Sequence, residues 1–327
     1  MKSDENIRKP NALLHLIRQQ QFAEPEKSKL VSFLQGLRVE KLGPATISAR
    51  EINEWCHLKE GVPSDLDEAF VLAHHVFAKS FNTDEQDLKV VLSTRRLLAN
   101  MKKTNLIQAD GTFKITWQGY PVLIVGATDS NRLFHPFALA VSKSKSAADF
   151  GFLFKSLHTY DLEYQPTILM ADGSDAITAG YEEVFGAPFR RLMCFFHVIK
   201  NVEQHLRGLT KGNRQVREFV DYFEEQWVRK YPYWFEGAAM KHPSTNNGIE
   251  STNAVLKRDY TFHERLPVGQ FLNLAADVVQ RWSEVRNPLS PNCIHFCIDA
   301  TPSLAEWTAA YQWKLLNKKV LQRKLVK

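Results

Sequence analysis

The stretch Asn105-Leu106-Ile107-Gln108-Ala109-Asp110-Gly111-Thr112-Phe113-Lys114 decides the fold that the rest of the chain is expected to adopt. Its apolar start predicts a strand in a buried sheet, and that strand runs into Asp110 and then a glycine. A carboxylate on a buried central strand is costly unless it is hydrogen-bonded, paired or bound to a metal. Asp110 is therefore the first candidate functional residue.

The segments after this stretch predict an α/β fold. In order, the expected elements are strands over 120–128 and 133–141, a helix over 146–160, a strand over 166–171 and a helix over 175–185. Residues 189–196 are a fifth strand or a strand running into a helix, and further helices follow. The order β-β-β-α-β-α-β-α predicts a mixed five-stranded sheet. Its crossovers should place the fourth strand parallel to the first and beside it.

Two more acidic residues complete a candidate metal site with Asp110. Asp172 ends the fourth strand, so it should lie beside Asp110, and Glu250 lies on a later helix. Converging carboxylates are stable together when a divalent cation neutralises them, and oxygen ligands favour Mg²⁺ or Mn²⁺. Asp129 and Asp175 are competitors, but turn chemistry explains the first and a helix first turn explains the second.

The helix that holds Glu250 is expected to begin at Ser244 or Thr245. With 3.6 residues per turn, one polar face of it is shared by Asn246, Glu250, Asn253 and Lys257. Lys257, with Arg258 beside it, is a candidate contact to a phosphate group.

The composition is that of a globular protein. Of the 327 residues, 44% are hydrophobic and 24% charged, and no apolar run is long enough to span a membrane. The N-terminus has no apolar signal region, so an intracellular protein is expected. Four cysteines predict no disulfide framework. The net charge of +6 tolerates a polyanionic partner, and residues 314–327 are Lys/Arg-rich with no acidic residue.

Residues 1–104 predict a mainly helical region. Helical patterns follow Pro10 and Pro25, and Ser48 with Glu51 three residues later forms a capping box.

Apolar runs over 70–77 and 88–92 in this region are strand-like. The adjacent His74 and His75 would point to opposite sides of such a strand. They are therefore a poor chelating pair, and a structural role is expected.

Together these residues resemble the transposase core of Mutator-like elements (MULE transposases), which belong to the DDE class with an RNase H-like fold. The resemblance covers about residues 105–275 and rests on 110–114, 125–129, 134–138, 171–173, 193–202 and 244–253. It implies that Asp110, Asp172 and Glu250 are the catalytic triad. It also implies that these residues bind Mg²⁺ or Mn²⁺ and that DNA is the substrate.

The family has a Cys-x-x-His signature after its second aspartate, which Cys194 and His197 match. This pair is half a zinc site, because a structural zinc needs four ligands. The chain offers Cys293, His295 and Cys297, or His242, as further ligands. A structural role, in which the pair orients its helix near the active site, is the favoured interpretation.

The expected domains are a helical region over 1–104, an RNase H-like transposase domain over 105–287 and a helical basic tail over 288–327. Glu250 follows Asp172 by 78 residues, which implies a helical insertion over about 198–243 that is shorter than the family pattern, with helices missing near 209–213. No WRKY- or FLYWCH-like zinc finger precedes the core, and no SWIM-type cluster follows it. The chain thus resembles a truncated or domesticated relative.

The leading hypothesis is a nuclear enzyme that cleaves and transfers DNA strands, acts on transposon ends or target DNA, and forms a homo-oligomer without a membrane partner. One alternative is a domesticated, catalytically inactive nuclear DNA-binding protein, whose binding would fall steeply with salt. Another is an oligomeric interaction scaffold without DNA contact.

Overall fold

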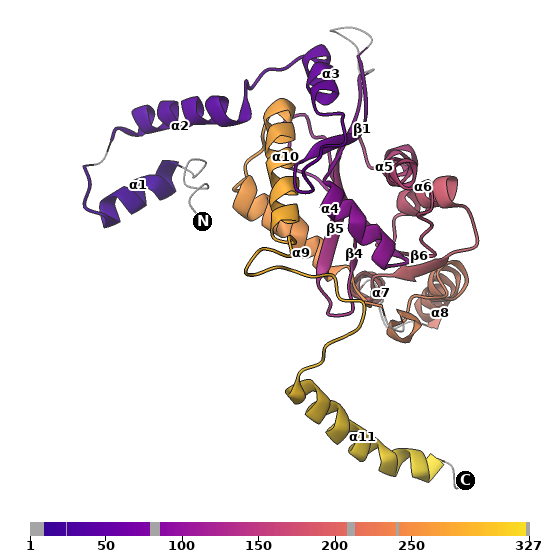
Figure 1. The fold of residues 1–327 in the computed structure, drawn as a ribbon. Helices are drawn as coiled ribbons and strands as arrows, with labels where there is room; N and C mark the ends of the chain where they lie inside the picture. Colours follow the sequence, from indigo (N-terminus) through magenta and orange to yellow (C-terminus); the bar gives the residue numbers. More distant parts are fainter. Residues whose placement is uncertain (1–9, 24, 79–85, 208–212, 240–241, 325–327) are drawn as a thin grey trace.

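A computed structural model describes residues 10–23, 25–78, 86–207, 213–239 and 242–324. A central sheet lies between two layers of helices (Figure 1). Its strands are β1 (Phe70–Ala78), β2 (Gln86–Ser93), β3 (Leu106–Thr112), β4 (Val122–Thr128), β5 (Phe134–Ser142), β6 (Ile168–Ala171) and β7 (Arg190–Met193).

Strand order in the sheet is β1-β2-β5-β4-β3-β6-β7. The predicted adjacency of the first and fourth core strands is confirmed, because β3 pairs with β6 in parallel. The two crossovers run through α5 (Ala147–Tyr160) and α6 (Asp175–Phe185), as parallel neighbours require. The prediction of five strands was too low: the described residues form seven, because β2 pairs with β5 and brings β1 with it.

The helices cover both faces of the sheet, and successive residues of a strand serve opposite faces. Val90 and Leu92 pack toward α3 (Ala49–Leu58), α9 (Asn247–Val255) and α10 (Val268–Glu284). Val91 packs toward α5 and α6 on the other face. Strands β4 and β5 are buried along their whole length, which fits their central position.

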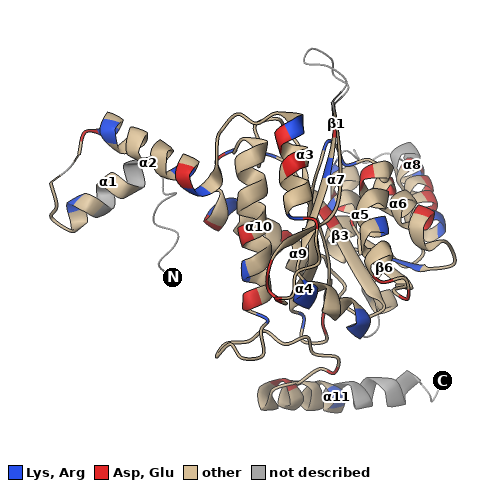
Figure 2. Ribbon diagram, turned by 45° about the horizontal axis from the view of Figure 1, so that its top comes forward, with Lys and Arg blue, Asp and Glu red and all other residues tan. Residues whose placement is uncertain are grey.

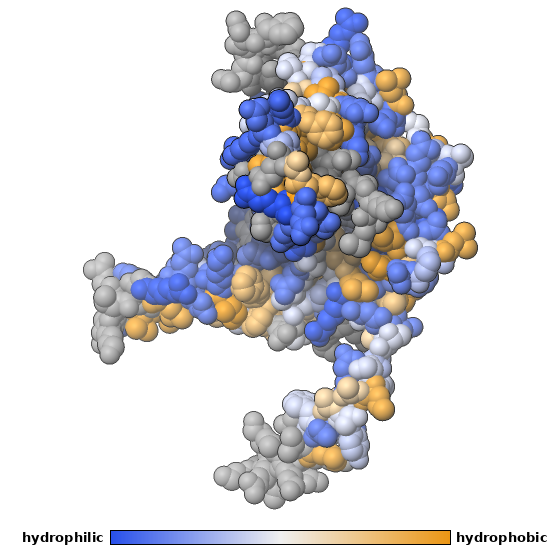
Figure 3. Space-filling view, turned by 90° about the vertical axis from the view of Figure 1, so that its left-hand side faces the viewer, coloured by the Kyte–Doolittle hydropathy of each residue, from blue (hydrophilic) through white to orange (hydrophobic). Residues whose placement is uncertain are grey.

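The remaining helices lie around this body. They are α1 (Pro10–Gln19), α2 (Lys27–Leu42), α4 (Arg95–Ala99), η2 (Asn100–Lys103), α7 (Phe195–Arg207), α8 (Asn213–Phe223), η3 (Glu224–Lys230), η4 (Glu236–Ala239), η5 (Leu256–Tyr260) and α11 (Leu304–Lys324). Helices α1 and α2 extend from one side, and α11 stands away from the body (Figures 1 and 3). Among the described helices, none is both long and apolar enough to cross a membrane.

Several predicted helix starts agree with the structure. The capping box of Ser48 and Glu51 opens α3, and Ser146 opens α5 with a second capping box. Three features predicted from the sequence lie at least partly outside the described residues: the N-terminal segment without a signal region, most of the junction near 209–213, and the last three residues of the basic tail.

Candidate functional site

Asp110 and Asp172 lie on neighbouring parallel strands. Gln108 of β3 is paired with Met170 of β6, and each aspartate lies two residues further along its chain. Both carboxylates therefore stand at the same level near the carboxyl ends of their strands. The Asp172 carboxylate accepts the Ser174 N–H at 3.0 Å, and the Arg191 guanidinium donates to the Asp172 carbonyl oxygen.

The Asp110 carboxylate has a neighbour on α9. Asn253 donates its side-chain N–H to Asp110 Oδ2 at 2.7 Å. Burial raises the pKa of Asp110, and the negative charges of Asp172 and Glu250 raise it further, while Lys145 and the Gly111 N–H oppose the shift. Asp110 is thus a buried acid within electrostatic reach of both other predicted acids.

Helix α9 lies on the sheet face that carries Gln108 and Asp110, and Figure 2 shows it between α10 and β3. Gln108 donates to the Asn246 side chain at 3.1 Å, while Thr128 donates to Gln108 at 2.6 Å. A Cβ on Gly248 would lie 2.7 Å from Phe134 Cβ, so this glycine permits the close approach of α9 to β5.

The helix begins after Asn246, not at the predicted Ser244 or Thr245. The Asn246 side chain makes no capping hydrogen bond, because it accepts from Gln108 instead.

Glu250 turns toward the Cys-x-x-His pair. Its Oε1 lies 3.5 Å from His197 Nδ1, and ligand atoms of Cys194, His197 and Glu250 all lie within 4.8 Å of one another. Both the Glu250 and His197 atoms are buried and have no hydrogen-bond partner among the described residues. Hydrogen bonding to Cys194 raises the pKa of His197, and the charges of Glu250 and Asp172 add to this against the effect of burial.

This arrangement differs from both metal sites suggested by the sequence. Among the described residues, Asp110, Asp172 and Glu250 do not form one group with ligand atoms within 4.8 Å, whereas Cys194 and His197 do with Glu250. The suggested zinc ligands Cys293, His295, Cys297 and His242 are not part of that group. A buried hydrogen bond links Cys194 to the start of α9, because the Asn246 N–H donates to Cys194 Sγ at 3.3 Å.

A pocket of about 370 Å³ opens beside Asp110. It is lined by Asp110, Thr112, Glu250, Asn253, Ala254, Lys257, Arg258 and His263. Both predicted phosphate contacts are in this lining, although Arg258 also pairs with Asp259 at 2.6 Å. Burial lowers the pKa of Lys257, and the nearby Lys114 and Lys145 lower it further, while Asp110 opposes this. The pocket thus combines carboxylates with a group of cations.

The two competing aspartates have structural roles, as predicted. Asp129 accepts backbone N–H groups from Asn131, Leu133 and Cys297. Asp175 lies in the first turn of α6 and accepts hydrogen bonds from Tyr231 and Lys230.

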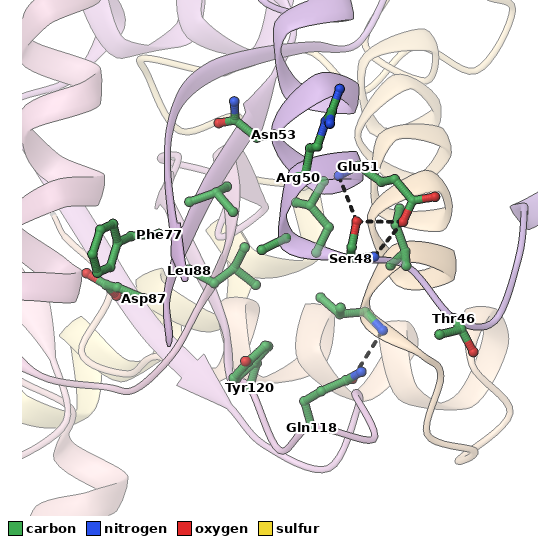
Figure 4. Close-up of a pocket in the computed structure, with 15 residues that line it drawn as sticks. Thr46, Ser48, Arg50, Glu51, Asn53, Phe77, Asp87, Leu88, Gln118 and Tyr120 are labelled. Carbon is green, nitrogen blue, oxygen red and sulfur yellow. Dashed lines mark hydrogen bonds between the residues drawn. The ribbon is translucent and has the colours of Figure 1, made fainter. Parts of the chain in front are cut away.

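A second, mostly apolar pocket of about 940 Å³ lies between α3, the β1–β2 pair and the start of α10 (Figure 4). Its rim includes Ser48 and Glu51 of the capping box, and Tyr120 and Gln118 come from the loop before β4. Asp110, Asp172 and Glu250 do not line this pocket.

Sequence reasoning missed several residues of the site. Asn253 was placed on the Glu250 face, but its bond to Asp110 was not foreseen. Lys145 donates to the Gly111 carbonyl at 2.7 Å and lies 5.7 Å from the Phe113 ring centroid. No local pattern signals that contact, because Lys145 comes from the loop after β5. Lys114 could have been predicted from the sequence, because it is the last residue of the 105–114 stretch that contains Asp110.

Comparison with known families gives one match over this region. Residues 106–201 match the family model described as MULE transposase domain. They span β3 to the first half of α7 and include Asp110, Asp172, Cys194 and His197. A search of curated proteins finds no match to the chain.

Proposed function

We propose that the chain, which carries a MULE transposase domain over residues 106–201, cleaves and transfers DNA strands with Asp110, Asp172 and Glu250 as a DDE triad. A transposase domain suggests a transposase-like function, a divalent metal and a DNA partner in general terms. The observation that carries the finer proposal is the position of Asp110 and Asp172 at one level on adjacent parallel strands. The order β5-β4-β3-β6-β7 within the sheet supports an RNase H-like core.

The donor set fits Mg²⁺ or Mn²⁺. All three side chains offer oxygen ligands, which these ions prefer. Asp110 is buried beside two like charges, and Glu250 Oε1 is buried without a hydrogen-bond partner, so a divalent cation bound between them would stabilise both groups. Asp110, Asp172 and Glu250 would hold such ions, which when bound would supply Lewis-acid activation of the attacking oxygen and stabilisation of the leaving oxygen of a phosphodiester.

The protein's own residues orient the carboxylates. Asn253 fixes one oxygen of Asp110, and the contacts from Asn246 to Gln108 and Cys194 fix the start of α9. Cys194 and His197 act in this proposal as positioning residues that hold the Glu250 carboxylate. Glu250 thus lies beside His197 and also lines the pocket that opens next to Asp110.

The cations beside the pocket provide a surface for the DNA backbone. Lys257 and Arg258 line the pocket, and Lys114 and Lys145 lie near Lys257. Like charges gathered at one place repel one another, and a phosphate group would relieve that repulsion. Nuclear localisation and assembly into a homo-oligomer belong to the same proposal.

The test is nicking of supercoiled plasmid DNA by the full chain with Mg²⁺ or Mn²⁺. Metal coordination supplies several kcal/mol of transition-state stabilisation. Because about 1.4 kcal/mol is tenfold in rate, Asp110→Asn and Asp172→Asn should each slow nicking about 100-fold or more. Asp175→Asn is the matched control, since this acid lies three residues from Asp172 but bonds to Tyr231 and Lys230.

Equal activity of Asp110→Asn and wild type would overturn the triad. Salt-sensitive DNA binding without nicking in any variant would instead identify the catalytically inactive DNA-binding protein.

A further inference from the structure

A second cluster of metal-ligating side chains lies where α3 meets β1, on elements that take no part in the carboxylate site. His57 is in the last turn of α3, Glu60 follows the end of that helix, and His74 is on β1. The backbone joins the two elements at the same place, because the Val71 N–H donates to the Lys59 carbonyl at 2.8 Å. The three side chains are thus brought together by the main chain.

The distances between the three side chains are those of a chelating group. His57 Nδ1 lies 2.9 Å from Glu60 Oε2, and His74 Nδ1 lies 3.9 Å from Glu60 Oε1. The imidazole rings meet edge to face with centroids 4.8 Å apart. One ligand atom from each residue lies within 4.8 Å of the others.

His74 supplies an independent indication that a ligand belongs here. Its side chain is only 9% exposed, and its Nδ1 has no hydrogen-bond partner among the described residues. Buried polar atoms in native proteins are almost always satisfied, so one that is not requires an explanation.

We propose that His57, Glu60 and His74 bind a Zn²⁺ ion that clips α3 to β1. Nitrogen and oxygen ligands lie about 2.0–2.2 Å from zinc, so two ligands at a tetrahedral angle are about 3.4 Å apart. Glu60 reaches the two imidazoles with different oxygens: Oε2 lies 2.9 Å from His57 Nδ1, a hydrogen-bond distance, and Oε1 lies 3.9 Å from His74 Nδ1. Imidazole and carboxylate together suit zinc, and water completes the fourth position because His57 and Glu60 are exposed.

Two neighbouring residues stay outside this site. Cys56 packs into the core, where its side chain is fully buried and turned away from the surface that exposes His57 and Glu60. His75 points to the opposite side of β1, where its Nε2 lies 3.6 Å from Asp87. The sequence-based view that His74 and His75 do not chelate together therefore holds, while His74 has partners on another element.

The experiment measures Zn²⁺ binding to the full chain after chelator treatment, in competition with a metal indicator dye. His57→Gln changes an exposed residue that can be replaced without disturbing the core. It should weaken zinc binding by more than about 100-fold, the upper end of the loss seen when only a supporting partner of a ligand is removed. Glu60→Gln should act in the same direction. His75→Gln, the matched control, should bind as wild type does.

Cobalt substitution separates this site from the group around Cys194. A site of two imidazoles and a carboxylate gives only weak visible absorption, whereas a cysteine ligand adds a strong sulfur-to-cobalt band. The expected result is one equivalent without sulfur character, which His57→Gln loses. Zinc should also raise the melting temperature of wild type more than that of His57→Gln. Unchanged affinity in His57→Gln, equal loss in His75→Gln, or binding with sulfur character alone would overturn the proposal.

Discussion

Asp110 and Asp172 are 62 residues apart in the chain, yet they stand at the same level on two hydrogen-bonded parallel strands. Their relationship depends on the sheet alone, because the register of β3 against β6 sets it. Glu250 depends on more, since α9 must be held against β3 by contacts such as that of Asn253 with Asp110, and the Glu250 carboxylate lies beside His197 of α7. One half of the site is therefore set by strand register and the other by how the helices pack on the sheet.

Asp110→Asn should stabilise the metal-free protein at neutral pH. The folded-state pKa of Asp110 is raised, so the folded protein binds its proton more tightly than the unfolded chain does. Stability then falls as pH rises from the unfolded value of about 3.9 through the higher folded pKa, where Asp110 loses its proton. Denaturant unfolding measures the effect. Asp129→Asn is the contrast, because it weakens the acceptor of three backbone N–H groups and should cost about 1–3 kcal/mol.

Asn253→Ala should slow metal-dependent nicking about 10–100-fold, the usual effect of losing a residue that orients a ligand. The change removes the 2.7 Å hydrogen bond to Asp110 and leaves every carboxylate present. DNA affinity should stay the same, because Asn253 carries no charge. Asn273→Ala on α10, whose partners are Leu42 and Trp55, should keep full activity. A loss confined to DNA affinity would argue against a positioning role.

His197 should give the protein a pH-dependent stability. Its folded-state pKa is raised, chiefly by Cys194, so the imidazolium contributes stability that is fully present below the unfolded value of about 6.5. That contribution is lost as pH rises through the higher folded pKa. Unfolding measured across this window should show the decline in wild type but not in His197→Gln. Glu250→Gln should shift the decline to lower pH, and identical profiles for all three proteins would contradict the assignment.

Lys257→Gln should weaken DNA binding to all sequences alike. Each phosphate contact releases counterions, so removing one should reduce the slope of log affinity against log salt by about 0.9. Binding of a duplex of mixed sequence at several salt concentrations measures that slope. Lys102→Gln is the control. Lys102 does not line the pocket, and its Nζ forms an ion pair with Asp161 at a distance of 3.3 Å. An unchanged slope in Lys257→Gln would remove this residue from the interface.

Gly180→Ala should destabilise the fold by about 1–3 kcal/mol, the usual cost of overpacking. A Cβ there would lie 2.7 Å from both the Ala147 carbonyl oxygen and the Gly151 nitrogen, where α6 crosses α5. Gly36→Ala in α2 is the matched control, because nothing lies within 4 Å of its Cβ. It should stabilise by about 0.5–1 kcal/mol. The denaturant midpoints of the two variants measure these changes in stability. Equal changes in both variants would contradict the close crossing of α5 and α6.

Local patterns predicted the core of the fold well. Strand periodicity, helix caps such as Ser48 and Ser146, and the crossover rule together were enough to place the fourth core strand beside the first. The turn role of Asp129 and the helical role of Asp175 also followed from local chemistry. The caps and turns depend on residues close together in the chain, whereas the pairing of the first and fourth core strands follows from the crossover rule.

The remaining features depend on distant residues. The pairing of β2 with β5 joins segments about 50 residues apart, so the strand-like runs before residue 104 gave no sign that they extend the core sheet. Asn246 was not foreseen as the helix start, because its side chain bonds to Gln108 from another element. The turn of Glu250 toward His197 likewise depends on how α7 and α9 meet, which no spacing encodes.

Gly248 determines how closely α9 packs against β5, and α9 in turn carries residues that line the pocket. With Phe134 Cβ only 2.7 Å from where a methyl group would stand, even alanine must lift the helix. Displacements of about 1 Å can cost roughly 100-fold in rate. The position of Glu250, the third carboxylate of the proposed triad, thus depends on Gly248, a residue that bears no functional group. Position 248 offers a way to vary geometry while the chemistry of all three acids stays intact.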